Sequence, residues 1–146
     1  VARRLELVKT IDRVRIYSDF AHHPTAIAET INAISDKILK NNNLFVIVEP
    51  RSNTMQSGIH KTALEKVLPN ADFFIIYDRE SLKWVKEFSQ KSDKFLGYFK
   101  KPQDIAKTVA KYIHKNDIIV IMSNGQINEL VDRVIEQIKL KKEKSL

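Results

Sequence analysis

An acid and two histidines lie within the short segment from Asp19 to Pro24, which reads Asp-Phe-Ala-His-His-Pro. A β-branched, apolar stretch precedes this segment and predicts a strand, and an amphipathic stretch that predicts a helix follows it. In open α/β sheets ligands bind at such strand-to-helix turns, because the helix amino terminus adds free amide donors and a positive dipole end. Asp19, His22 and His23 are therefore candidate binding residues.

More than one role is open to these side chains. Asp19 could bind a ribose hydroxyl, as an acid at a strand end does in nucleotide-binding folds, or it could accept amides of the turn and cap the helix. A metal site is disfavoured, because adjacent histidines rarely bind one ion together and no other cluster of metal ligands is visible in the sequence. The sequence leaves the two roles of Asp19 open.

A second polar segment, from Glu49 to Met55, follows another apolar stretch. It contains an arginine beside three small polar residues, namely Arg51, Ser52, Asn53 and Thr54. A guanidinium makes bidentate bonds with carboxylates and phosphates, so the segment is a candidate clamp for an anionic group of a substrate. A solvated loop is the alternative interpretation. His60 and Lys61 open the next predicted helix and could add positive charge.

A third polar segment consists of Ser123, Asn124 and Gly125. Small residues at a helix start let backbone amides approach an anion, although an ordinary strand-to-helix turn explains this triplet equally simply. All three segments follow predicted parallel strands, so we expect them at the same edge of the sheet. Arg3 and Arg4 precede the first predicted strand; they would fray in an isolated domain and would lie at the hinge in a longer chain.

The elements that must position these residues alternate between strands and helices. Strands are predicted over residues 5–11, 14–18, 44–48, 73–77, 95–98 and 118–122. Helices are predicted over residues 24–39, 61–68, 81–89, 102–114 and 128–142, with a polar loop over residues 50–58. The alternation predicts a Rossmann-like α/β fold, with a mainly parallel, doubly wound sheet and helices on both faces. Asp12-Arg13 predicts a tight hairpin, and hence an antiparallel amino-terminal strand.

Length and composition indicate one domain over residues 1–146, because 146 residues with 43% hydrophobic content suffice for one core. The chain has no cysteine, no apolar run of membrane-spanning length and no signal-peptide pattern. We therefore expect a cytoplasmic protein without a membrane partner. The chain starts at Val1 without an initiator methionine, so we expect a piece of a longer polypeptide, with processing as the alternative.

A net charge of +7 allows a nucleic-acid partner. The basic residues are scattered, however, and the lysine-rich residues 139–144 are typical of a solvated helix end. Aromatic stacking platforms for single strands are not evident. We expect no nucleic-acid partner, and a free-standing basic α/β module that binds RNA or DNA remains an alternative.

The three glycines, Gly58, Gly97 and Gly125, cannot form a P-loop or a G-x-G-x-x-G fingerprint. Neither a Ser-His-Asp order nor a nucleophile elbow is visible. The chain lacks a phosphate cradle of its own, so it should not be a complete nucleotide-using enzyme.

The residues before the first predicted strand and the three polar segments, taken in order, resemble the carboxy-terminal domain of the Mur ligases. These are the ATP-dependent amide-bond-forming enzymes of peptidoglycan synthesis. Residues 3–6 resemble the start of that domain, and residues 18–24 resemble a motif of the muramate-joining members. Residues 49–55, Glu-Pro-Arg-Ser-Asn-Thr-Met, and residues 122–125, Met-Ser-Asn-Gly, resemble the members that act in peptidoglycan recycling. Two departures stand out: Ser18 replaces an aspartate, and residues 126–128 replace further glycines.

The resemblance implies that the full-length enzyme joins UDP-N-acetylmuramate to L-alanyl-γ-D-glutamyl-meso-diaminopimelate. ATP would phosphorylate the lactoyl carboxylate, and the peptide amine would attack the acyl phosphate. The resemblance implies two further domains as partners, an amino-terminal and a central one, both absent from this chain; most contacts to ATP and Mg²⁺ would belong to the central domain. The carboxy-terminal domain, to which this chain corresponds, would close over the site. It would be inactive alone, with no catalytic residue of its own. The same domain of the L-alanine-adding ligase is an alternative.

The resemblance also implies two groups of site residues. The nucleotide-facing group is Arg3, Arg4, Asp19, His22 and His23. The group facing the incoming peptide is Arg51, Ser52, Asn53, Thr54, Ser123 and Asn124.

Overall fold

The computed structural model describes residues 5–21, 23–88 and 92–144. The strands in this part of the chain are β1 (Glu6–Ile11), β2 (Val14–Asp19), β3 (Leu44–Val48), β4 (Phe73–Tyr77), β5 (Phe95–Phe99) and β6 (Ile118–Met122). The helices are α1 (Pro24–Ser35), α2 (Asn53–Ser57), α3 (Lys61–Val67), the 3₁₀ turn η1 (Leu68–Asn70), α4 (Lys83–Lys86), α5 (Pro102–Tyr112) and α6 (Asn128–Lys144).

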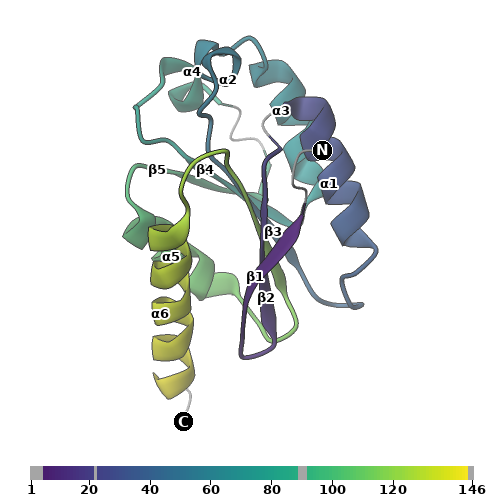
Figure 1. The fold of residues 1–146 in the computed structure, drawn as a ribbon, viewed down its shortest axis with the longest axis vertical. Coiled ribbons are helices and arrows are strands. Elements are labelled where there is room, and N and C mark those ends of the chain that lie inside the picture. The colour runs from purple at the N-terminus through teal and green to yellow at the C-terminus, as the bar shows by residue number, and fades with distance from the viewer. Residues whose placement is uncertain (1–4, 22, 89–91, 145–146) are drawn as a thin grey trace.

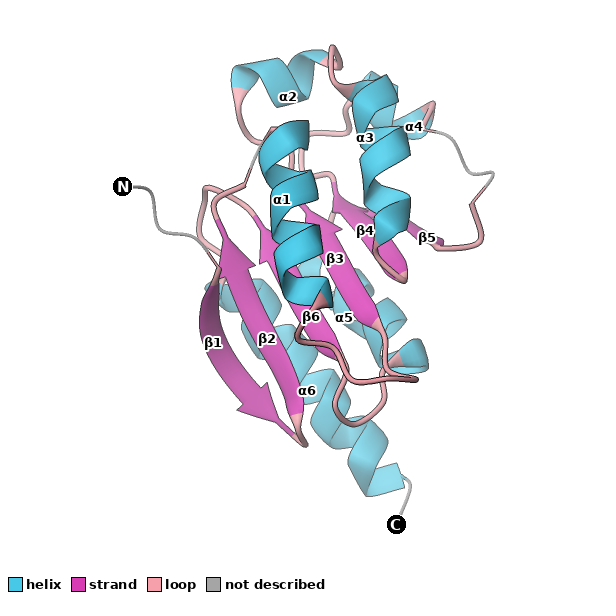
Figure 2. Ribbon diagram, turned by 90° about the vertical axis from the view of Figure 1, so that its right-hand side faces the viewer, coloured by secondary structure: helices cyan, strands magenta, loops and turns pink. Residues whose placement is uncertain are grey.

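The strands form one twisted sheet in the order β1-β2-β6-β3-β4-β5. β1 pairs with β2 in the antiparallel sense, and all other pairs are parallel. Helices α1 and α3 cover one face of the sheet, and α5 and α6 cover the other (Figures 1 and 2). The predicted mainly parallel, doubly wound fold with an antiparallel amino-terminal strand is therefore confirmed.

Two apolar cores, one on each face of the sheet, explain why the central strands are apolar along their whole length. In β6, Ile118 and Val120 face the core under α1 and α3, whereas Ile119 and Ile121 face the core under α5 and α6. Alternate side chains of a strand point to opposite faces, so a strand covered on both faces needs apolar residues at every position.

The hairpin between β1 and β2 turns through Asp12 and Arg13, as predicted. Both residues have positive φ values, 50° and 63°. A two-residue turn with positive φ at both positions matches the twist of the flanking strands.

The order of the central strands brings the three polar segments together. Met122 at the end of β6 is level with Asp19 of β2 on one side and with Val48 of β3 on the other. The amide of Ser123 donates to the carbonyl of Asp19 (3.0 Å), and that of Glu49 donates to the carbonyl of Met122 (2.9 Å). The expectation of a shared edge is confirmed for the described residues of these segments.

The predicted loop over residues 50–58 is wrong, because it contains helix α2. The Ser52 hydroxyl accepts the amide of Met55 (3.2 Å) and so caps the helix start. The Met55 side chain is 1% exposed and anchors the helix to the core under α1. Gly58 ends the helix in the left-handed conformation, with φ of 85°.

α3 and α5 end one and two residues before their predicted ends, and two other predicted helices are shorter by four residues or more. α1 ends at Ser35 rather than at residue 39, because the amide of Lys37 reaches back to Ile34 (2.9 Å) in a tighter turn. The helix predicted over residues 81–89 is reduced to α4, because Ser81 has a positive φ of 55° and Asp78 binds the amide of Leu82. Residue 89 lies outside the described residues.

Among the described residues, we find no helix with both the length and the apolar character needed to cross a membrane.

Candidate functional site

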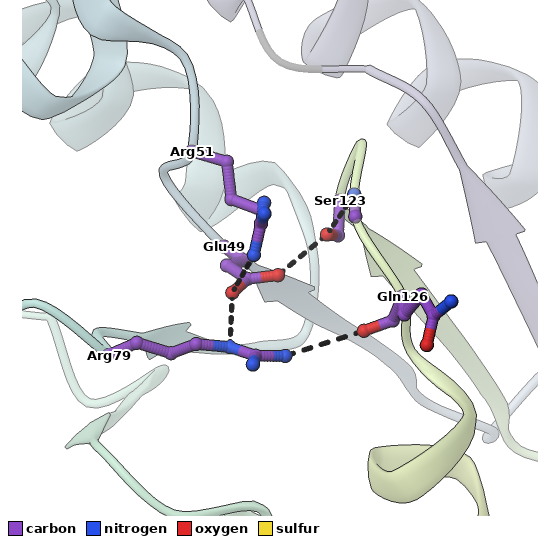
Figure 3. A network of polar contacts seen from close by, with 6 residues as sticks. Glu49, Arg51, Arg79, Ser123 and Gln126 are labelled. Atoms are coloured by element: carbon purple, nitrogen blue, oxygen red, sulfur yellow. Dashed lines mark hydrogen bonds and ion pairs between the residues drawn. The ribbon is translucent and has the colours of Figure 1, made fainter.

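Glu49, the residue after β3, is the centre of a polar network at the carboxyl edge of the sheet (Figure 3). Its side chain is 3% exposed. One carboxylate oxygen accepts the hydroxyl of Ser123 at 2.6 Å. The other lies 2.6 Å from Nε of Arg79 and 3.5 Å from a terminal nitrogen of Arg51. A buried carboxylate is tolerated only when it is paired and hydrogen-bonded, and these three contacts meet that need.

Arg51 belongs to the loop after β3, and its side chain lies against the loop after β6. Its side chain remains 43% exposed, although one nitrogen approaches Glu49. It also passes so close to Gly125 that a Cβ atom there would be 2.6–2.9 Å from Nε, Cζ and Cδ of Arg51. The absence of a side chain at position 125 therefore makes room for the Arg51 guanidinium.

Sequence reasoning missed Arg79, which follows β4. Its Nε makes the short contact with Glu49, and a terminal nitrogen donates to the carbonyl of Gln126 at 3.3 Å. The guanidinium carbon also lies 4.6 Å from the centre of the Tyr77 ring. The available signal was a polar residue after a fourth predicted parallel strand, because that position also reaches the carboxyl edge.

Ser123 is buried, at 6% exposure, and its hydroxyl serves two groups. It donates to Glu49 and accepts the amide of Gly125 at 3.0 Å. Ser123 thus ties the turn after β6 to the buried carboxylate after β3. Asn124, the next predicted site residue, is exposed on that turn.

Asp19 is 4% exposed, and its carboxylate is bound by three donors of its own chain. The amide of Ala21 donates to one oxygen at 2.7 Å. The amide of Leu5 and the hydroxyl of Thr30 donate to the other, at 3.1 and 2.9 Å. These contacts favour the structural role that the sequence left open. The nucleotide role of Asp19 stays a prediction.

The remaining residues of the second segment belong to α2. The hydroxyl of Ser52 caps the helix and lies 3.4 Å from that of Thr54, whereas Asn53 is exposed in the first turn. Ser52 thus has a structural role in this conformation, and the peptide-binding roles of Ser52, Asn53 and Thr54 stay predictions.

His23 caps α1 through its Nδ1 atom, which accepts the amide of Thr25 at 3.2 Å. Its ring meets that of His60 edge to face, with centroids 4.7 Å apart. His60 precedes α3, as predicted. The predicted residues Arg3, Arg4 and His22 lie outside the described residues.

A hollow of about 250 Å³ opens beside this network, between the ends of β2 and β6. Ser18, Asp19, Ser123 and Gly125 line part of it. Two of the three predicted segments therefore border one space. Within residues 5–21, 23–88 and 92–144, no group of three or more histidine, aspartate or glutamate side chains is arranged to hold a metal ion.

The network also changes the acidity of Tyr77. Burial raises the pKa of the Tyr77 phenol above its ordinary value of 10.0, and Glu49 raises it further. Arg79 opposes this shift and lowers the pKa, because its positive charge stabilises the phenolate. The phenol is therefore neutral and can donate a hydrogen bond at physiological pH.

Several known proteins are similar to this chain. It is 31% identical over 140 residues to the UDP-N-acetylmuramate–L-alanyl-γ-D-glutamyl-meso-2,6-diaminoheptandioate ligase of Haemophilus influenzae, a match that covers 95% of the chain and 31% of that protein. It is 28% identical to the UDP-N-acetylmuramate–L-alanine ligase of Caldicellulosiruptor saccharolyticus, with 96% of the chain and 32% of that protein covered. The chain thus spans about a third of the length of these relatives.

The fold is also that of a solved relative. The crystal structure of a murein peptide ligase from Psychrobacter arcticus superposes with a TM-score of 0.74 at 32% identity, over 92% of this chain and 29% of that one. The family model described as the glutamate ligase domain of Mur ligases matches residues 3–125. This match includes all three polar segments, and the chain therefore belongs to the Mur ligase family.

Proposed function

We propose that this chain is the carboxy-terminal domain of a murein peptide ligase. The complete enzyme would use ATP to join UDP-N-acetylmuramate to L-alanyl-γ-D-glutamyl-meso-diaminopimelate. Membership of the family and the similarity to the Haemophilus influenzae ligase support the reaction class. ATP as a co-substrate would locate the reaction in the cytoplasm.

The position of Arg51 is the observation that carries the proposal. Its guanidinium stands at the carboxyl edge of the sheet, 43% exposed, beside the turn formed by Ser123 and Gly125. Two guanidiniums surround the single carboxylate of Glu49, so the cluster has an excess of positive charge. Such a cluster suits a carboxylate of the incoming peptide, because guanidinium and carboxylate form paired, charge-assisted hydrogen bonds.

This domain would contribute positioning rather than a chemical group. An arginine that holds a remote carboxylate fixes the direction of the peptide and so brings its amine to the reacting carbonyl. Fixing two reactants in this way can supply several kcal/mol of the barrier reduction, roughly 7–11 kcal/mol in the best cases. Closure of the domain would also exclude water from the activated carboxylate.

ATP and Mg²⁺ would be bound mainly by domains outside this chain. Few side chains among the described residues are candidates for a contact with the nucleotide. His23 is exposed at the start of α1 and suits a phosphate or ribose contact, whereas Asp19 is already engaged by three internal donors. The roles of Arg3, Arg4 and His22 rest on the motif resemblance alone.

The direct test is steady-state kinetics of the complete ligase with Arg51→Ala. We expect the KM for the tripeptide to rise at least tenfold, while the KM for ATP stays within twofold of wild type. Arg133→Ala is the matched control, because Arg133 on α6 has a similar exposure of 41%. An unchanged tripeptide KM in Arg51→Ala would remove Arg51 from the peptide site.

The L-alanine-adding ligase is the second candidate, because 28% identity to that enzyme extends over 96% of the chain. Competition between L-alanine and the tripeptide as acceptors of the complete ligase separates the two candidates. We expect the tripeptide to be consumed in preference. Preferential use of L-alanine would assign the chain to the other enzyme.

A further inference from the structure

The two arginines at Glu49 do not share its carboxylate equally. Nε of Arg79 approaches one oxygen to 2.6 Å, whereas the nearest nitrogen of Arg51 stays 3.5 Å from the same oxygen. The other oxygen accepts the Ser123 hydroxyl. Arg79 is thus the close charge partner of Glu49, and Arg51 is a distant one.

Arg79 is held in place on three sides. Besides Glu49, it contacts the carbonyl of Gln126 at 3.3 Å (Figure 3). Its guanidinium also lies over the Tyr77 ring. Gln126 belongs to the turn after Gly125, where this chain has no further glycines. Arg79 therefore joins the ends of β3, β4 and β6 around one carboxylate.

A carboxylate with 3% exposure requires a nearby cation, because removing one partner of a buried pair leaves an uncompensated charge at high cost. If Arg79 were absent, Arg51 would be the remaining cation within reach among the described contacts of Glu49. The flexible Arg51 side chain would then close the 3.5 Å gap and turn its hydrogen-bonding edge inward.

We infer that Arg79 is a positioning residue, which satisfies Glu49 and thereby leaves the guanidinium of Arg51 available to a carboxylate of the incoming peptide. The inference rests on the proposed function for the identity of that peptide. Arg79 thus has an indirect role without a substrate contact.

A double-mutant cycle in the complete ligase tests this role. Arg79→Ala should raise the tripeptide KM about tenfold in the wild-type background and leave the KM for ATP unchanged. In the Glu49→Gln background, the same change should have less than a twofold effect, because the neutral amide at position 49 no longer attracts Arg51. A tenfold effect in both backgrounds would mean that Arg79 binds the peptide itself. No effect in either background would also overturn the inference.

A substrate-free measurement separates this inference from the proposed function. A crystal structure of this chain with Arg79→Ala should show the nearest Arg51 nitrogen within about 3 Å of Glu49, compared with 3.5 Å here. An Arg51 that keeps its present position would refute the linkage, whatever the substrate is. A shifted Arg51 combined with a normal tripeptide KM in Arg51→Ala would instead refute the proposed peptide-binding role of Arg51. If Arg79→Ala does not fold, Arg79→Gln retains the stem of the side chain and takes its place.

Discussion

The hydroxyl of Ser123 donates a 2.6 Å hydrogen bond to the buried carboxylate of Glu49, and it thereby joins the loops after β6 and β3. The same hydroxyl accepts the amide of Gly125. One small side chain thus orders the turn on which Arg51 rests.

Ser123→Ala should lower the free energy of unfolding by about 1–3 kcal/mol, because it leaves the Glu49 oxygen and the Gly125 amide without a partner. Urea unfolding followed by circular dichroism measures this change. Asn124→Ala is the control: the exposed neighbour should alter stability by less than about 0.5 kcal/mol. Equal stability of the two variants would contradict a stabilising role of the Ser123 hydroxyl.

Gly125→Ala should affect binding more than stability. The new methyl group would meet the end of the flexible Arg51 side chain, which can move aside at small cost to folding. We therefore expect a nearly wild-type thermal midpoint for this chain and a several-fold higher tripeptide KM for the complete ligase.

Gly58→Ala is the matched comparison for that variant. Gly58 has a φ of 85°, and a Cβ atom there would be 2.9 Å from the Trp84 ring, which is packed in the core. The left-handed conformation alone costs a residue with a side chain about 1–2 kcal/mol. Gly58→Ala should therefore lower the thermal midpoint clearly. A clearly lower thermal midpoint for Gly125→Ala, together with a nearly wild-type midpoint for Gly58→Ala, would refute these two predictions.

Asp19→Asn should destabilise the chain by about 1–3 kcal/mol, because an amide cannot accept all three donors that the carboxylate binds. Thr30→Val removes a single donor of the same network and should cost about 1 kcal/mol. Chemical unfolding of both variants tests whether Asp19→Asn lowers the free energy of unfolding more than Thr30→Val does. In the complete ligase, an Asp19→Ala variant with unchanged ATP KM and turnover would remove Asp19 from the nucleotide site.

The raised pKa of Tyr77 predicts a loss of stability in alkali. The folded state holds the phenolic proton more tightly than the unfolded state does, so the folded state binds more protons between the two pKa values. The free energy of unfolding should therefore fall as pH rises above the ordinary phenol pKa of 10.0. Urea midpoints measured from about pH 8 to about pH 11 should fall less steeply for Tyr77→Phe than for wild type. Tyr112→Phe leaves Tyr77 in place and is the control; parallel curves for all three proteins would contradict the prediction.

The sequence by itself determined the classes of the main elements and the edge of the sheet at which the candidate site residues meet. Apolar stretches bounded by polar turns marked the strands, and the alternation with helices required parallel pairing, so Asp19, Glu49 and Ser123 had to meet at one edge. Local chemistry was also sufficient for the hairpin at Asp12 and Arg13. Local sequence was not sufficient to predict the short helix α2. This helix forms because Met55 reaches the core, a tertiary contact that the polar residues around Met55 do not indicate.

Only the tertiary structure decided which side chains touch. The place of β6 between β2 and β3 results from long-range pairing and is not encoded in any local pattern. That order brings Ser123 to Glu49, and the place of β4 beside β3 brings Arg79 to the same carboxylate. Arg79 reads as an ordinary turn residue in the sequence. It becomes part of the site because a buried charge must find a partner, and the fold puts Arg79 within reach.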